Sequence, residues 1–327
     1  MKWSARSKKP IIIHAYGGYA NAERMWLKAR VLEGGKIIFT RQDSTLRNLI
    51  NTYKRFESDE ISFAPIRIEW ERGSLEVKSD KEGYIIVDHP HKASLTAAES
   101  CWLPVKLQLP AKALEIETEL LIPGEQADFG VISDIDDTVI FTGVSSRMKW
   151  RLIINSIARN VYQRRTIEGA SPWYKLLEKG ASGSNKNPFF YISNSPWNIY
   201  NYLSAFLKVN DFPRGPILLR DFGLSTFSAK KLEEKNKYKQ ICNILRAFPT
   251  LNFLLIGDAA EQDAELYLKV AQRFPGRVSS IYIRSVDHRK RMDHVRAIIE
   301  QTKGVEILLV HSAQEAIAHG KAKGYIQ

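Results

Sequence analysis

The sequence predicts a chain in two parts, an antiparallel β-sandwich followed by an α/β fold built on a parallel sheet. Up to about residue 122, short runs alternate apolar and polar residues between turn signals, which is typical of antiparallel strands. From residue 129, short continuous apolar runs alternate with helical patterns, which is typical of a parallel sheet covered on both faces. Turn-forming residues 123–128 separate the two patterns, so we expect domains over residues 1–126 and 127–327.

The first domain is expected to consist of short strands joined by turns. Gly34 and Gly35 form one turn signal and Arg72 and Gly73 another, while residues 43–54 have the pattern of a helical insertion. The expected strands are residues 10–14, 26–32, 36–40, 66–70, 75–78, 84–87, 103–109 and 115–122.

In the second domain, apolar runs that predict buried strands alternate with amphipathic helical segments. The apolar runs lie at residues 129–133, 189–192, 216–220, 252–257, 278–283 and 305–310. The helical segments lie at residues 172–179, 197–209, 230–248, 261–273 and 288–302. We therefore expect ligand-binding residues just past the carboxyl ends of the strands.

Two carboxylates follow the first buried strand of this domain. Asp134 and Asp136 are two residues apart, so an extended chain would point both side chains the same way. Carboxylates this close repel each other, and a divalent cation would hold both ionised. One could then attack as a nucleophile while the other moves a proton. The alternative is a plain turn, because aspartates are common after strands.

Three later stretches favour the chemical interpretation. Ser193 and Asn194 follow the second apolar run and offer hydroxyl, amide and backbone N–H groups to phosphate oxygens. Lys237 lies in a charged helical segment and could balance phosphate charge, while the lysines around it read as a solvated face. Asp258 ends the apolar run at 252–257, and Asp263 follows five residues later.

In this order the four motifs resemble the signature of haloacid-dehalogenase-like phosphotransferases. Within that superfamily, residues 127–285 resemble the actin-patch-type phosphatidate phosphatases of fungi and their bacterial relatives. The segments that carry the resemblance are residues 133–138, 191–198, 218–223 and 255–258. Two positions depart from the family pattern: Asn236 stands where a histidine is usual, and Ala259-Ala260 replaces Ser-Gly.

The resemblance implies a Mg²⁺-dependent phosphatase with a haloacid-dehalogenase-like parallel sheet. It implies that Asp134 attacks phosphorus to form an aspartyl-phosphate and that Asp136 serves as acid and then as base. It also implies a metal held by Asp134, Asp258 and the main-chain oxygen of Asp136, with Asp263 behind them. The residues implied in phosphate binding are Thr138, Ser193, Asn194 and Lys237.

The basic composition bears on the substrate. The 327 residues carry 48 Lys and Arg against 36 Asp and Glu, a net charge of +12, which favours polyanions or an anionic membrane. Residues 145–167 contain six Arg and Lys and no acidic residue, beside an apolar helical stripe. This segment reads either as a core helix with a solvated basic side or as a substrate-facing membrane cap.

These features predict phosphatidate as the substrate and diacylglycerol as the product, which would place the protein in lipid metabolism. Only two cysteines and no apolar run of about 18 residues predict a cytoplasmic protein that attaches peripherally to a membrane. The alternatives are a soluble phosphomonoesterase, a nucleic-acid-end phosphatase and a non-catalytic adaptor. Among the partners we expect phosphatidate or another phosphomonoester and an anionic membrane surface, and nucleic acid is the less favoured polyanion.

Overall fold

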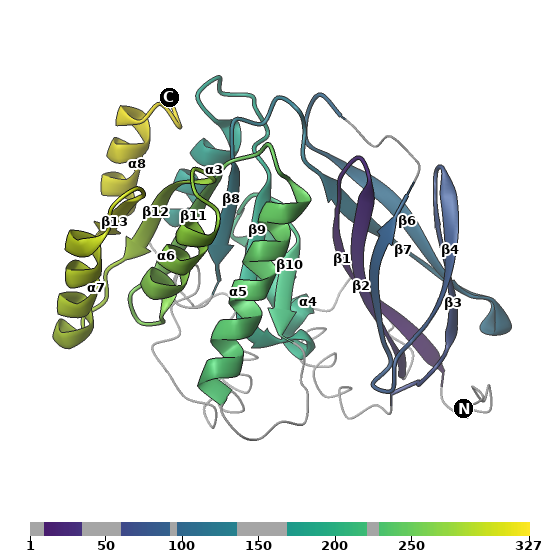
Figure 1. The fold of residues 1–327 in the computed structure, drawn as a ribbon. Helices are drawn as coiled ribbons and strands as arrows, with labels where there is room; N and C mark the ends of the chain where they lie inside the picture. Colours follow the sequence, from purple (N-terminus) through teal and green to yellow (C-terminus); the bar gives the residue numbers. More distant parts are fainter. Residues whose placement is uncertain (1–9, 35–59, 92–96, 136–168, 221–228) are drawn as a thin grey trace. The chain divides into compact units, whose positions relative to one another are not determined.

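The structure is a computed structural model that describes residues 10–34, 60–91, 97–135, 169–220 and 229–327 (Figure 1). These residues form two compact units, Met1–Pro123 and Gly124–Gln327. The first unit is built on one β-sheet and the second on a separate parallel sheet between helices. The predicted α/β class is therefore confirmed.

The first unit contains one seven-stranded sheet with the strand order β4-β3-β6-β7-β1-β2-β5. Among its described strand pairs, only β1 and β7 run parallel, through Gly18 opposite Leu120 and Tyr19 opposite Leu121. The sheet is therefore mixed, and the prediction of a purely antiparallel arrangement was wrong at this pair. The strands are β1 (Ile11–Ala20), β2 (Arg24–Glu33), β3 (Pro65–Trp70), β4 (Gly73–Lys78), β5 (Tyr84–Pro90), β6 (Cys101–Leu109) and β7 (Leu114–Ile122), with a 3₁₀ turn η2 (Pro110–Lys112) before β7.

One apolar core serves the whole of this sheet. Ile68 of β3 and Val87 of β5 belong to the same buried cluster, although these strands lie near opposite ends of the strand order. The sheet must therefore curve around a single core. Apolar and polar residues alternate along its strands, so one face of the sheet is apolar and packs in this core. The predicted strand at 36–40 and the helical insertion at 43–54 lie outside the described residues.

The second unit is organised by a six-stranded parallel sheet with the order β10-β9-β8-β11-β12-β13. Its strands are short and largely apolar, and the two central strands, β8 and β11, are buried from end to end. They are β8 (Gly130–Asp134), β9 (Phe189–Pro196), β10 (Ile217–Arg220), β11 (Phe253–Asp258), β12 (Val278–Arg284) and β13 (Glu306–Val310).

The strand order reverses between β8 and β11. Counted from β8, the sheet reads 3-2-1-4-5-6, which is the doubly wound order. Because crossover connections are right-handed, the helices that connect β8, β9 and β10 lie on one face of the sheet, and those that connect β11, β12 and β13 lie on the opposite face. α5 and α6 lie in front of the strands in Figure 1. The helices are α3 (Ala170–Lys179), η3 (Trp197–Ile199), α4 (Tyr200–Val209), α5 (Ala229–Ala247), α6 (Asp263–Arg273), α7 (Arg289–Gln301) and α8 (Ala313–Ala322).

The final helix, α8, was not predicted. Ser312 caps this helix: its hydroxyl accepts a hydrogen bond from the N–H of Glu315, whose carboxylate accepts from the N–H of His311, the residue before the cap. That spacing was a readable start signal. In the part of the chain that the structure describes, every helix is too short or too polar to cross a bilayer.

Candidate active site

The candidate site lies at the carboxyl ends of β8 and β11, where the strand order reverses. These two strands pair in parallel, with Ile132 opposite Leu255 and Ser133 opposite Ile256. They end at Asp134 and Asp258 respectively, and both side chains are completely buried. A crevice at such a reversal is the usual ligand-binding position of a doubly wound sheet. The strand pairing thus brings together two aspartates that are 124 residues apart in sequence.

Asp134 is anchored by its own strand. The Ser133 hydroxyl donates to the main-chain oxygen of Asp134 at 2.9 Å and shares a 2.8 Å hydrogen bond with the Tyr174 hydroxyl on α3. Burial raises the pKa of Tyr174, so this phenol stays neutral at physiological pH. The end of β8 is therefore fixed to α3 by neutral hydrogen bonds, and the Asp134 carboxylate is left to face the site.

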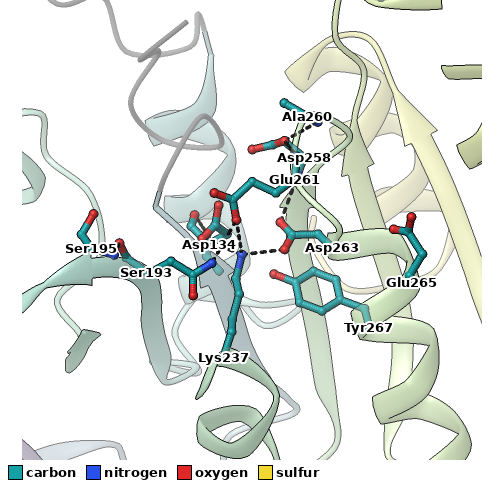
Figure 2. A network of polar contacts seen from close by, with 12 residues as sticks. Asp134, Ser193, Ser195, Lys237, Asp258, Ala260, Glu261, Asp263, Glu265 and Tyr267 are labelled. Carbon is teal, nitrogen blue, oxygen red and sulfur yellow. Dashed lines mark hydrogen bonds and ion pairs between the residues drawn. The ribbon is translucent and has the colours of Figure 1, made fainter. Parts of the chain in front are cut away.

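Lys237 reaches the same point from α5. Its ammonium Nζ lies 2.9 Å from Asp134 Oδ1, 2.5 Å from Asp263 Oδ1 and 3.1 Å from Glu261 Oε2 (Figure 2). Burial by itself would lower the pKa of Lys237, but these three carboxylates raise it well above its usual value. The lysine is therefore charged. Lys239, two residues further along α5, is exposed.

The turn after β11 is held by its own carboxylates. Asp258 Oδ1 accepts hydrogen bonds from the backbone N–H groups of Ala260 at 2.5 Å and Glu261 at 2.9 Å. The N–H of Asp258 donates to Asp263 Oδ2 at 3.1 Å. A Cβ at Gly257 would lie 2.2 Å from that same Asp263 oxygen, so only glycine allows the carboxylate this close.

Two of the predicted phosphate-binding residues, Ser193 and Asn194, lie on the neighbouring strand β9. Ser193 follows Ile192, which pairs with Asp134, and its buried hydroxyl accepts a 2.9 Å hydrogen bond from the N–H of Ser195. The Asn194 amide donates to Glu261 Oε2 at 3.4 Å. The structure thus places Asn194 and Lys237 on the same carboxylate oxygen, with Ser193 beside Asp134. Asp136 and Thr138 lie outside the described residues.

The charges of the cluster suit a divalent cation. Among the described residues, three carboxylates, those of Asp134, Glu261 and Asp263, contact one ammonium, and the carboxylate of Asp258 lies close enough to interact electrostatically with this cluster. One oxygen each from Asp134, Glu261 and Asp263 lie within 4.8 Å of one another. Burial, with Asp263 and Glu261 nearby, raises the pKa of Asp258 to about 8. A bound cation would relieve this excess of buried negative charge, and oxygen-only donors fit a hard cation such as Mg²⁺.

Glu261 was missed in the sequence. Its side chain is 32% exposed, contacts Lys237 and Asn194, and completes the carboxylate triad. Three acidic residues within six positions after a buried strand were a usable signal. The spacing alone did not show which of the three would face Lys237, because that contact depends on the packing of α5 against α6.

Comparison with known proteins finds a family model that matches part of the second unit. Residues 129–285 match the family model described as "Phosphatidate phosphatase APP1, catalytic domain". The chain is 39% identical over 160 residues to the Saccharomyces cerevisiae protein of that name. The aligned region covers 47% of this chain and 25% of the yeast protein. An uncharacterized Schizosaccharomyces pombe protein is 29% identical over 218 residues, covering 64% of this chain and 34% of that protein.

The match spans about a quarter to a third of the length of these two relatives. Among solved structures, a carbohydrate acetylesterase from Xanthomonas citri aligns with a TM-score of 0.30 and 10% identity, over 91% of this chain and 67% of that one. So low a score supports no argument about fold or function. On the sequence match, residues 129–285 are similar to the catalytic-domain family of phosphatidate phosphatase APP1.

Proposed function

We propose that this chain is a Mg²⁺-dependent phosphatase that hydrolyses phosphatidate to diacylglycerol and phosphate. The observation that carries the proposal is the buried Lys237 ammonium, 2.9 Å from the Asp134 carboxylate that ends β8. A lysine beside a strand-end aspartate is suited to phosphoryl transfer, because it balances the charge of the phosphate oxygens. The name of the yeast relative supports phosphatidate as the substrate.

The proposal includes the fold type and the domain organisation. The doubly wound strand order, with candidate site residues on the three neighbouring strands β9, β8 and β11, supports a haloacid-dehalogenase-like sheet in the catalytic domain. We assign this domain to residues 127–327 and a separate β domain to residues 1–126. The break between compact units at residues 123 and 124 supports that division.

In the proposed reaction a carboxylate oxygen of Asp134 attacks phosphorus, and the bond from phosphorus to the glycerol oxygen breaks. Asp136 gives its proton to that leaving oxygen, which completes diacylglycerol. Asp136 then takes a proton from a water molecule, whose oxygen attacks phosphorus and breaks the bond to Asp134. Phosphate leaves and both carboxyl groups return to their starting forms. Lys237, Asn194, Ser193 and Thr138 would bind the phosphate oxygens during both steps.

Asp134, Asp258 and the main-chain oxygen of Asp136 would hold the Mg²⁺, with Asp263 orienting them. The bound cation supplies charge stabilisation to the phosphate oxygens and keeps the neighbouring carboxylates ionised. In the described residues, Asp263 already bridges Lys237 and the N–H of Asp258. It would therefore fix the distance between the ammonium and the metal-binding strand end.

A substrate panel tests the proposed activity. Phosphate release is measured from phosphatidate in vesicles, from a soluble phosphate monoester and from a 3′-phosphorylated oligonucleotide, each with and without Mg²⁺. The proposal predicts fastest turnover of phosphatidate and loss of activity when the metal is chelated. Preference for the soluble ester or the oligonucleotide would replace phosphatidate as the substrate. Inactivity on all three would favour the adaptor interpretation.

We also propose that the protein is cytoplasmic and attaches peripherally to anionic membranes. The net charge of +12 and the acid-free segment 145–167, which lies outside the described residues, support this. Changing Arg151 and Arg159 to Glu should weaken sedimentation with anionic vesicles and reduce its salt dependence. Hydrolysis of a soluble ester should be retained. Unchanged sedimentation of a folded variant would contradict the membrane role.

A further inference from the structure

Arg291 connects α7 to the turn that carries the candidate site. Its Nε donates to the main-chain oxygen of Ala259 at 2.7 Å, and its Nη2 donates to the main-chain oxygen of Glu261. The same guanidinium forms a two-pronged ion pair with Glu265, at 2.7 Å to Oε1 and 2.9 Å to Oε2. Arg291 lies six residues beyond the segment that matches the catalytic-domain family.

The two carbonyls belong to the turn that orients Asp258. Arg291 holds the oxygens of Ala259 and Glu261, while Asp258 holds the N–H groups of Ala260 and Glu261. Hydrogen bonds therefore hold the turn from two sides. The Arg291 guanidinium donates to its carbonyl oxygens, and the Asp258 carboxylate accepts from its N–H groups. Any shift of the turn would move both the Asp258 carboxylate and the Glu261 side chain that contacts Lys237.

Glu265 pairs with the Arg291 guanidinium and is not part of the carboxylate cluster around Lys237. Figure 2 shows Glu265 on α6 pointing away from Lys237. Burial would raise the pKa of Glu265, but hydrogen bonds and charge from Arg291, together with His294 at 2.9 Å, hold it below its usual value. Glu265 is therefore ionised and fixes the plane of the guanidinium, which in turn directs Nε and Nη2 to the turn.

We propose that Arg291 is a positioning residue for the metal-binding end of β11, acting through the backbone of residues 259–261. The inference rests on the proposed phosphatase function. An arginine that formed only a salt bridge would contact Glu265 alone. Here two of the three guanidinium nitrogens of Arg291 donate hydrogen bonds to main-chain carbonyl oxygens of the site. Lysine has a single donor centre and does not reproduce the planar fork, so Arg291→Lys should behave as a loss of positioning.

The test compares four variants with the wild-type chain: Arg291→Lys, Arg291→Ala, Glu265→Gln and Arg296→Ala. Arg296 is the control because it lies on the same helix, is exposed and pairs only with Asp293 in the described structure. Mg²⁺ binding is measured by calorimetry without substrate. Turnover of phosphatidate is measured as kcat and KM over a range of Mg²⁺ concentrations, with a thermal melt of each variant.

Removing a group that orients metal ligands typically costs about 10- to 100-fold in metal affinity or activity. Both Arg291 variants should therefore lose about 10- to 100-fold in Mg²⁺ affinity and kcat, with KM for phosphatidate nearly unchanged. Glu265→Gln should lose less, because the guanidinium still holds both carbonyls. Arg296→Ala should match the wild type.

The outcomes separate this inference from the proposed function. Arg291 variants that melt earlier but keep wild-type Mg²⁺ affinity and kcat would show a structural salt bridge and overturn the positioning role. Wild type that binds Mg²⁺ but turns over no phosphate ester would overturn the proposed function, while the calorimetric comparison would still decide the role of Arg291. Wild type that neither binds Mg²⁺ nor turns over would overturn both.

Discussion

The two units use their charged residues in opposite ways. In the first unit, Lys106 on β6 faces Glu115 and Glu117 on β7 at 3.1 and 3.5 Å, and all three side chains are about half exposed or more. In the second unit, Lys237 faces Asp134 and Asp263 at similar distances, and these side chains are no more than 2% exposed. Exposed pairs contribute little to stability, whereas a buried cluster costs desolvation energy. A buried cluster that is retained at such a cost indicates a functional site.

The largest expected effect is that of Asp134→Asn. An amide is a poor nucleophile and a poor ligand for Mg²⁺, so phosphate release should fall by roughly 10⁴-fold or more. The exchange removes one charge with almost no change in volume, and the folded protein should therefore persist. Steady-state phosphate release, with circular dichroism of the same sample, checks both statements. Near-wild-type turnover would exclude the covalent mechanism.

Lys237→Ala should act on both activity and stability. Losing one donor to the phosphate oxygens costs about 10²- to 10³-fold in kcat by analogy with other charge-stabilising groups. Lys237 is 2% exposed and pairs with buried carboxylates. Leaving those carboxylates without their partner should lower the free energy of unfolding by about 3–5 kcal/mol. Denaturant melts and kinetics measure the two effects.

Lys239→Ala is the matched control for this prediction. Lys239 lies on the same helix but is exposed, so the same truncation should leave kcat and the denaturation midpoint unchanged. Equal losses in the two variants would mean that the helix, and not the Lys237 ammonium, is responsible.

Gly257→Ala should have an intermediate effect. The new Cβ would lie 2.2 Å from Asp263 Oδ2, so the carboxylate must move away from Lys237 and from the N–H of Asp258. Misplacing a site group by about 1 Å can cost on the order of 10²-fold in rate. Kinetics of phosphate release checks the loss. Full activity would indicate that the position of Asp263 is unimportant.

The smallest effect is expected in the first unit. Lys106→Ala removes an exposed partner of Glu115 and Glu117, and such pairs often contribute nothing measurable. The thermal midpoint and the phosphatase activity should both be unchanged. A clear loss of either would mean that the β-sheet surface has a role that its exposed charges do not suggest.

Local pattern predicted the strand ends but not the contacts between distant segments. Short continuous apolar runs placed Asp134 and Asp258 at strand ends, because buried parallel strands have that signature. Two contacts depend on how α5, α6 and α7 pack. They are the ion pair of Glu261 with Lys237 and the hydrogen bonds from Arg291 to the backbone of residues 259–261. No periodicity within one segment encodes such packing.

The first unit shows the same limit. Most of its described strands were predicted close to their observed bounds, for example β6 at Cys101–Leu109 and β7 at Leu114–Ile122, but the prediction for β1 ended at residue 14 and the strand continues to Ala20. The parallel pairing of β1 with β7 was missed, because it joins strands about 100 residues apart through only two residue pairs. Strand existence is a local property, whereas strand order is set by closure of the shared core.

Trapping the phosphorylated protein tests the central claim most directly. Wild-type protein is mixed with phosphatidate carrying a labelled phosphate, quenched in acid within one turnover, and the protein-bound label is measured before and after hydroxylamine treatment. The account predicts label on the wild type that hydroxylamine removes, as expected of an acyl phosphate, and none on Asp134→Asn. Equal labelling of Asp134→Asn, or phosphate release by the wild type with no labelled protein at any time, would contradict the assignment of Asp134 as nucleophile.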